Sequence, residues 1–103
     1  MKESEIEKLK EEHGPLAYAT TPDGRDIVVC KPKGGAMRRF TDKATSDKGS
    51  KYSAAEELVM SCVVYPDRDQ ARSILLSYEA LTLALSAAAQ DLSGSDCEIK
   101  KSD

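Results

Sequence analysis

Few residues in this chain stand out by type and position as candidates for chemistry. They are one histidine, three cysteines and a small group of carboxylates, namely His13, Cys30, Cys62, Cys97, Asp67, Asp69 and Glu79. No two cysteines form a CxxC pair, and a single histidine with widely separated cysteines lacks the spacing of a zinc site. Asp67 and Asp69 are explained by a helix start, where carboxylates cap free N–H groups and favour the helix dipole. We therefore expect no catalytic residue, no cofactor, no metal and no enzyme activity.

Cys62 and His13 each allow a functional and a structural interpretation. Cys62 could be a nucleophile, but no histidine or asparagine accompanies it in a recognisable motif, and free cysteines commonly behave as small buried hydrophobes. His13 could act in catalysis, but it lies beside Gly14 at the end of a charged segment, where its charge would favour a helix C-terminus. We favour the structural interpretation for both.

A basic cluster lies in the stretch "KPKGGAMRRFTDK" and consists of Lys31, Lys33, Arg38, Arg39 and Lys43. The stretch lacks the GxxxxGK[ST] spacing of a phosphate-binding loop. The cluster could contact phosphates or an acidic partner, or it could be a solvated helix face. Phe40 beside the two arginines is compatible with an interface, where arginine and aromatic residues are enriched.

The composition is that of a globular domain, with 103 residues, 40% apolar, 32% charged and a net charge of −3. This length allows one domain at most. The mild negative charge and the low aromatic content of 5% argue against a general nucleic-acid binder and a polybasic membrane anchor. The charged N-terminus does not resemble a signal peptide, and no window reaches the roughly 20 apolar residues that span a bilayer. We expect an intracellular protein with reduced thiols.

Residues 16–31 are expected to form a β-hairpin. Two β-prone runs, 16–20 and 25–31, flank Pro22-Asp23-Gly24, in which proline sets one turn position and glycine supplies a positive φ. Pro32 closes the second strand. Both faces of that strand are apolar, so one face should pack on helices, while the other face or the open edge is a candidate surface for self-association.

Four segments have helical patterns. Residues 1–14 form a charged helix with a narrow apolar stripe of Ile6 and Leu9, and further helices are expected at about 35–46, 53–65 and 68–93, the last with a bend or break at Ser77. Residues 95–103 are expected to be a flexible polar tail. The predicted fold is α+β and predominantly α: an N-terminal helix, one hairpin, then three to four packed helices in a single domain over 15–94.

The joint between the last two expected helices, "CVVYPDRDQ", carries clear boundary signals. Ser53 and Glu56 form a capping box for the helix before the joint, and Pro66 is expected to end that helix. Asp67 with Gln70 starts the next helix, and Gly94 is expected as the residue after its end. The joint is therefore interpreted as a device that fixes the angle between two apolar helices.

Three stretches together resemble small tail assembly chaperones of long-tailed bacteriophages: "VVCKPKGGAMRRF", "SAAEELVMSCVVYPD" and "LLSYEALTLALSAAAQDLSG". In that family a strand ends in a basic residue and proline, matched by Lys31-Pro32. A helix with an arginine–aromatic pair follows, matched by Arg38 to Phe40. The resemblance covers about residues 27–94, and Glu79 departs from it, because a proline is expected there.

The resemblance implies a chaperone in the host bacterial cytoplasm that binds the tape-measure protein and keeps it soluble until tail-tube protein polymerises around it. The tail-tube protein is then a possible second partner, and neither nucleic acid nor a membrane is expected as one. Candidate partner-binding residues are Ile6, Leu9, Met37, Arg38, Arg39, Phe40, Met60 and Tyr78; methionines suit adaptable grooves.

Two alternatives remain open at this point. One is a tail completion or other structural protein that stays in the virion. The other is a small nucleic-acid-associated regulator that uses the basic cluster between Lys31 and Lys43, for which binding would depend steeply on salt.

Overall fold

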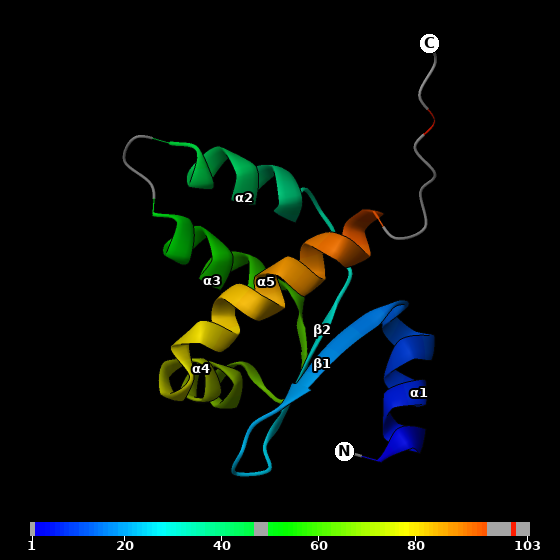
Figure 1. Ribbon diagram of the computed structural model, residues 1–103. Coiled ribbons are helices and arrows are strands. Elements are labelled where there is room, and N and C mark those ends of the chain that lie inside the picture. The colour runs from blue at the N-terminus through cyan, green and yellow to red at the C-terminus, as the bar shows by residue number, and fades with distance from the viewer. Residues whose placement is uncertain (1, 47–49, 95–99, 101–103) are drawn as a thin grey trace.

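The computed structural model describes residues 2–46, 50–94 and 100 of the chain. Within them the elements run in the order α1 (Glu3–His13), β1 (Leu16–Thr20), β2 (Asp26–Cys30), α2 (Ala36–Ala44), α3 (Lys51–Cys62), β3 (Val63–Tyr65), α4 (Arg68–Ser77) and α5 (Glu79–Gly94). Figure 1 shows α5 crossing the middle of the molecule, with α1 and α2 at its margins. The fold is α+β and mainly helical, as the sequence predicts.

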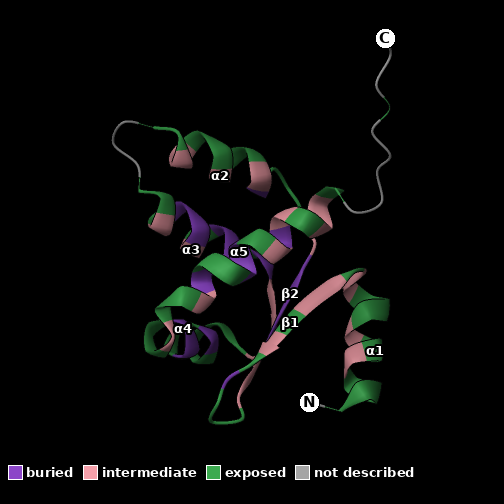
Figure 2. Ribbon diagram, in the orientation of Figure 1, coloured by how far each residue is buried: buried purple, intermediate pink, exposed green. Residues whose placement is uncertain are grey.

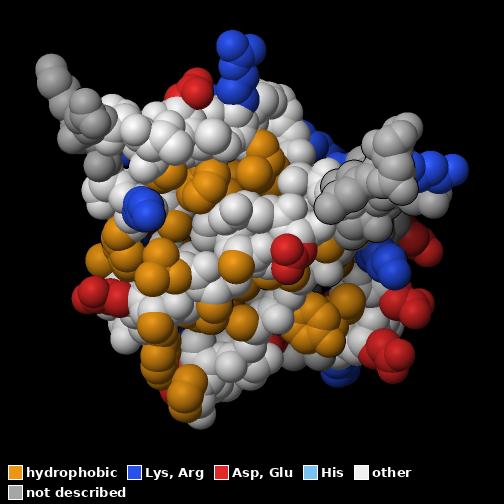
Figure 3. All heavy atoms as spheres, turned by 45° about the horizontal axis from the view of Figure 1, so that its top comes forward, with side chains coloured by type: hydrophobic (Ala, Val, Ile, Leu, Met, Phe, Trp, Pro, Cys, Tyr) orange, Lys and Arg blue, Asp and Glu red, His pale blue; other side chains and the backbone are white. Residues whose placement is uncertain are grey.

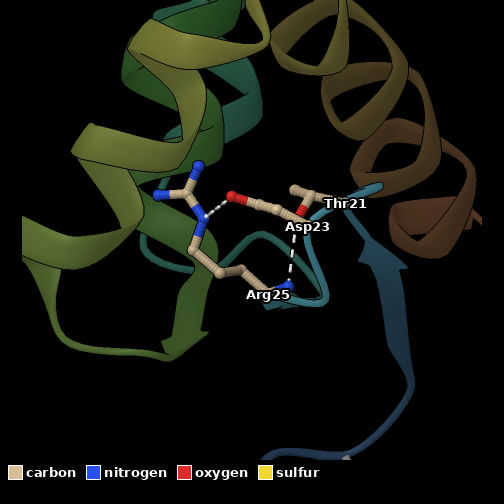
Figure 4. A network of polar contacts seen from close by, with 3 residues as sticks. All are labelled: Thr21, Asp23 and Arg25. Carbon is tan, nitrogen blue, oxygen red and sulfur yellow. Dashed lines mark hydrogen bonds and ion pairs between the residues drawn. The ribbon is translucent and has the colours of Figure 1, made fainter.

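The predicted hairpin is present as β1 and β2, which pair antiparallel from Leu16 opposite Cys30 to Thr20 opposite Asp26. Gly24 in the turn has a φ of 85°, a conformation that glycine adopts without strain. Figure 4 shows the polar contacts that close this turn. The Thr21 hydroxyl donates to the Asp23 carboxylate, the Arg25 backbone N–H donates to Thr21 Oγ1 at 2.9 Å, and Arg25 Nε lies 2.9 Å from Asp23 Oδ2.

The sheet has a third strand that the sequence pattern did not indicate. The helix expected over 53–65 ends at Cys62, and Val63–Tyr65 pairs antiparallel with β2, with Val63 opposite Val29 and Tyr65 opposite Val28. The β-branched residues Val63 and Val64 suit a strand, and pairing with β2 outweighs the continuation of the apolar helical pattern. Pro66 therefore follows a strand rather than ending α3.

Of the two helix starts predicted around the joint, one is wrong and one is confirmed. The prediction of a Ser53–Glu56 capping box is wrong, because the N-cap of α3 is Ser50, whose side chain accepts a hydrogen bond from the Ser53 N–H at 3.3 Å. Ser53 therefore already lies in the first helical turn. The prediction for Asp67 is confirmed: its Oδ1 accepts from the backbone N–H of Gln70 at 2.9 Å.

The apolar segment expected as a helix over 68–93 is divided at Tyr78, one residue after the expected bend or break. Tyr78 has φ −132° and ψ 75°, so it leaves the helical region, while its N–H still donates to the Ile74 carbonyl. The Arg25 guanidinium lies 5.9 Å from the centre of the Tyr78 ring, which joins the hairpin turn to this corner. Gly94 is the last residue of α5 rather than the residue after it.

The other expected boundaries lie close to those of the structure. α2 occupies 36–44 of the expected 35–46, and Gly35 precedes it with a φ of 79°. Residues 95–99 and 101–103 of the expected tail lie outside the described residues.

The core lies between one face of the sheet and α3, α4 and α5. Ile27 and Val29 of β2 pack there with Leu58, Val59 and further side chains, which are Ala36, Met60, Cys62, Ala71, Ile74, Leu75, Leu85 and Ala89. Figure 2 shows that the buried residues line β2 and the facing sides of these helices. Val28 is also fully buried, and its cross-strand partners Tyr18 and Tyr65 are 55% and 41% exposed.

The N-terminal helix α1 is the most loosely attached element. It contains no buried residue, its half-buried positions include Ile6 and Leu9, and it packs beside β1. In the described part of the chain, no helix combines the length and the apolar character that crossing a membrane requires.

Candidate binding groove

A groove of about 410 Å³ runs along α3, with α2 on one side and the start of α4 on the other. Its lining consists of Ala36, Arg39 and Phe40 from α2, Ala54, Glu56, Glu57, Leu58, Met60 and Ser61 from α3, and Arg68 and Arg72 from α4. Arg39 and Phe40 follow Ala36 of α2 by three and four positions, and Arg72 follows Arg68 of α4 by four, so each helix presents one face to the groove.

The floor of the groove is apolar. Leu58 and Met60 are 2% and 5% exposed, so they belong to the core and only their outer atoms are accessible from the groove. Phe40 is half-buried and packs against the same core from α2. The floor is therefore supported by packed side chains, which keeps its shape fixed.

Arginines stand on both walls. Arg39 Nη1 donates to the Gly34 carbonyl at 2.8 Å, and Arg68 Nη1 donates to the Met60 carbonyl at 3.4 Å. These bonds hold both guanidinium groups close to the groove. The acidic lining residues are Glu56 and Glu57, and Glu57 is paired with Lys43 of α2 at 2.6 Å.

A second hollow of about 190 Å³ continues the groove between α3 and α4. It shares Glu56, Met60 and Arg72 with the groove and adds Tyr52, Leu75 and Leu76. Leu76 is 70% exposed, which makes it an apolar contact point at the end of this hollow. Together the two hollows form one depression along α3 with Arg72 at the junction.

The structure brings together three of the eight predicted partner-binding residues, Arg39, Phe40 and Met60. Met37 packs on the core and Arg38 is exposed, and neither lines the groove. Ile6 and Leu9 lie on α1, away from it (Figure 1). Sequence reasoning missed Arg68, Arg72 and Leu76, although an arginine pair four residues apart on the polar face of α4 was a usable signal.

Tyr78 lines a different hollow, of about 470 Å³, between the hairpin turn and the start of α5. Its neighbours there include Pro22, Leu81 and Ala84. Leu83 of α5 is 52% exposed close by in the chain. Figure 3 shows hydrophobic side chains reaching the surface in several patches on the face that α5 crosses, with few charged side chains among them.

The structure also locates Cys62 and His13, the two residues for which a catalytic role was considered. Cys62 is 2% exposed, and burial raises the pKa of its thiol, with the neighbouring Ser61 hydroxyl acting in the opposite direction. His13 Nε2 lies 3.8 Å from the Glu12 carboxylate at the end of α1. Within residues 2–46, 50–94 and 100, no three His, Cys, Asp or Glu side chains gather in a way that could hold a metal ion.

The basic cluster of the sequence does not converge on one point. Arg39 is directed to the Gly34 carbonyl, Lys43 is paired with Glu57, and Arg38 is exposed and does not line the groove. The cluster contributes Arg39 to the groove, and the remaining positive charge of the groove comes from α4.

A family model described as a domain of unknown function, DUF6848, matches residues 17–101 of the chain. A solved structure of an uncharacterised protein from Bacillus stearothermophilus, rbstp2171, is similar to the chain with a TM-score of 0.69 and 18% sequence identity, covering 94% of this chain and 99% of that one. At that identity the similarity concerns the fold. No match was found among curated proteins.

Proposed function

We propose that the chain, which belongs to the DUF6848 family, is a non-enzymatic binding protein whose groove holds an amphipathic helical segment of a longer partner. The observation that supports this is the groove along α3, with its apolar floor of Phe40, Leu58 and Met60 between two helical walls. Helix-in-groove recognition uses anchors at positions i, i+3, i+4 and i+7, which insert into a groove of this kind.

The partner that we propose is the tape-measure protein of a long-tailed bacteriophage, with the chain acting as its assembly chaperone in the host cytoplasm. This identification rests on the resemblance described above, over residues 27–94. A tape measure is expected to be a long, partly apolar helical chain that must stay unaggregated before tail-tube protein surrounds it. A groove that covers one apolar stripe at a time would lower the exposed apolar area of such a chain.

Co-expression with a tape-measure protein of a long-tailed bacteriophage tests the proposal. We expect a larger soluble fraction of the tape measure and a complex that co-elutes in size-exclusion chromatography. An unchanged soluble fraction together with no complex would remove the chaperone function. Mass spectrometry of purified virions separates the alternatives, because a chaperone is absent from the particle and a tail completion protein remains in it.

A further inference from the structure

We infer that the groove selects helical segments in which carboxylates flank the apolar anchors. This inference rests on the proposed binding of a helical segment and adds the chemistry by which a segment is chosen. The wall residues must provide this selectivity, because an apolar floor alone accepts any apolar side chain of suitable size.

The groove has an excess of positive charge in a chain whose net charge is −3. Three arginines line it, Arg39, Arg68 and Arg72, against two glutamates. Glu57 is already neutralised by Lys43 at 2.6 Å, which leaves Glu56 as the remaining negative group of the lining. A segment with acidic flanks therefore gains attraction on both walls, and a basic segment meets repulsion.

The arginines also have donors to spare. Each guanidinium carries five N–H donors, and the bonds of Arg39 to Gly34 and of Arg68 to Met60 use one nitrogen each. Arg72 makes no hydrogen bond or ion pair with the described residues of the chain. It stands where the groove meets the second hollow, so a carboxylate there would lie between anchors seated near Met60 and near Leu76.

A protein helix suits these walls better than a nucleic acid does. Single-stranded nucleic acids need aromatic side chains for base stacking, and Phe40 is the one aromatic residue in the lining of the groove. Its half-buried ring packs on the core, where apolar side chains of a helix can reach it. In a helix with carboxylates between its apolar anchors, the anchors match the apolar floor and the carboxylates match the charged walls.

The test uses the full chain and three fluorescein-labelled helical peptides with one identical leucine stripe. The flanking positions are glutamate in the first peptide, glutamine in the second and lysine in the third. Fluorescence anisotropy should give the lowest Kd for the glutamate peptide, roughly ten-fold below that of the glutamine peptide, and the weakest binding for the lysine peptide. The advantage of glutamate should shrink as salt is raised.

Two matched variants locate the effect. Arg72→Glu should weaken binding of the glutamate peptide by roughly ten-fold and improve binding of the lysine peptide. Lys8→Glu makes the same charge change on α1, at the opposite margin of the molecule (Figure 1), and should leave both affinities unchanged. Circular dichroism of both variants checks that each is folded.

The inference would be overturned by equal affinity for the glutamate and lysine peptides, by no binding of any peptide, or by equal effects of the two variants. Tighter binding of a single-stranded oligonucleotide than of the glutamate peptide would overturn it as well. Equal affinity for all three peptides would leave the proposed function standing with anchors that bind without charge selection. Failure of co-expression would remove the proposed function itself.

Discussion

The side chains of Lys43 on α2 and Glu57 on α3 form an ion pair of 2.6 Å that ties one wall of the groove to its base. Both side chains are partly exposed, at 39% and 69%, so the pair is screened by solvent. Glu57→Gln should therefore lower the free energy of unfolding by less than about 1 kcal/mol, as measured by urea denaturation. Amide hydrogen exchange of α2 should accelerate, because α3 is its main packing partner. A loss larger than this, unaffected by salt, would contradict the account.

The Asp67 cap predicts a difference between two neighbouring aspartates. Asp67→Ala removes the acceptor for the Gln70 N–H at the start of α4 and should cost about 1 kcal/mol of unfolding free energy. Asp69→Ala, in the same first turn, removes only a favourable dipole interaction and should cost a few tenths of a kcal/mol. Urea denaturation of both variants measures the difference, and equal losses would show that the cap is not the stabilising contact.

The elements that local sequence determines were predictable, and those that depend on distant pairing were not. Pro22-Asp23-Gly24 specifies a turn, and Asp67 specifies a helix start, because the chemistry lies within a few residues. Val63–Tyr65 continues an apolar helical pattern, and it becomes a strand because β2 is available to pair with it. The helix break at Tyr78 carries no proline or glycine signal, and the ring of Tyr78 meets Arg25 of the distant hairpin.

The groove could be predicted from the sequence only in part, for the same reason. Phe40 and Met60 could be named as candidates from residue type alone, but their proximity follows from the packing of α2 on α3. Arg68 and Arg72 join them only because the third strand turns the chain before α4 begins. The direction of α4, and with it the positive charge of the groove, is therefore a tertiary property.

The free energy of unfolding should depend on pH through the hairpin turn. The pKa of the Asp23 carboxyl is lowered from its ordinary value of 3.8, chiefly by the hydrogen bond from the Thr21 hydroxyl and further by Arg25. Because the folded state holds this carboxylate ionised, its contribution is present above pH 3.8 and is lost as the pH falls below that value. Thr21→Val should return the pKa of Asp23 towards 3.8, measured by NMR titration of the carboxyl carbon. An unchanged titration would assign the shift to Arg25 instead.

Cys62 should behave as a core residue with an unreactive thiol. Burial raises its pKa above the ordinary value of 9.0, so the thiolate fraction is small and alkylation by iodoacetamide at pH 8 should be slow until the protein unfolds. Since the unfolded state releases this proton first, the stability that the neutral thiol contributes is present below pH 9.0 and declines above it. Cys62→Ala should remove that alkaline decline.

The serine substitution separates a structural from a functional role for the same residue. Cys62→Ser places a hydroxyl in the core and should cost about 1–3 kcal/mol of unfolding free energy, with partner binding retained in the folded fraction. Unchanged stability together with abolished binding would contradict the structural interpretation of Cys62.

Phe40 is the residue whose truncation should separate stability from binding most clearly. Phe40→Ala removes a half-buried ring from the floor of the groove and should lower the free energy of unfolding by about 1–2 kcal/mol, less than a fully buried ring would. The soluble tape-measure fraction in co-expression should fall with it. Leu83→Ala removes a 52% exposed side chain from α5 and should change stability by less than about 0.5 kcal/mol while leaving that fraction unchanged. If Leu83→Ala reduced the soluble fraction and Phe40→Ala did not, the partner would bind on the α5 face rather than in the groove.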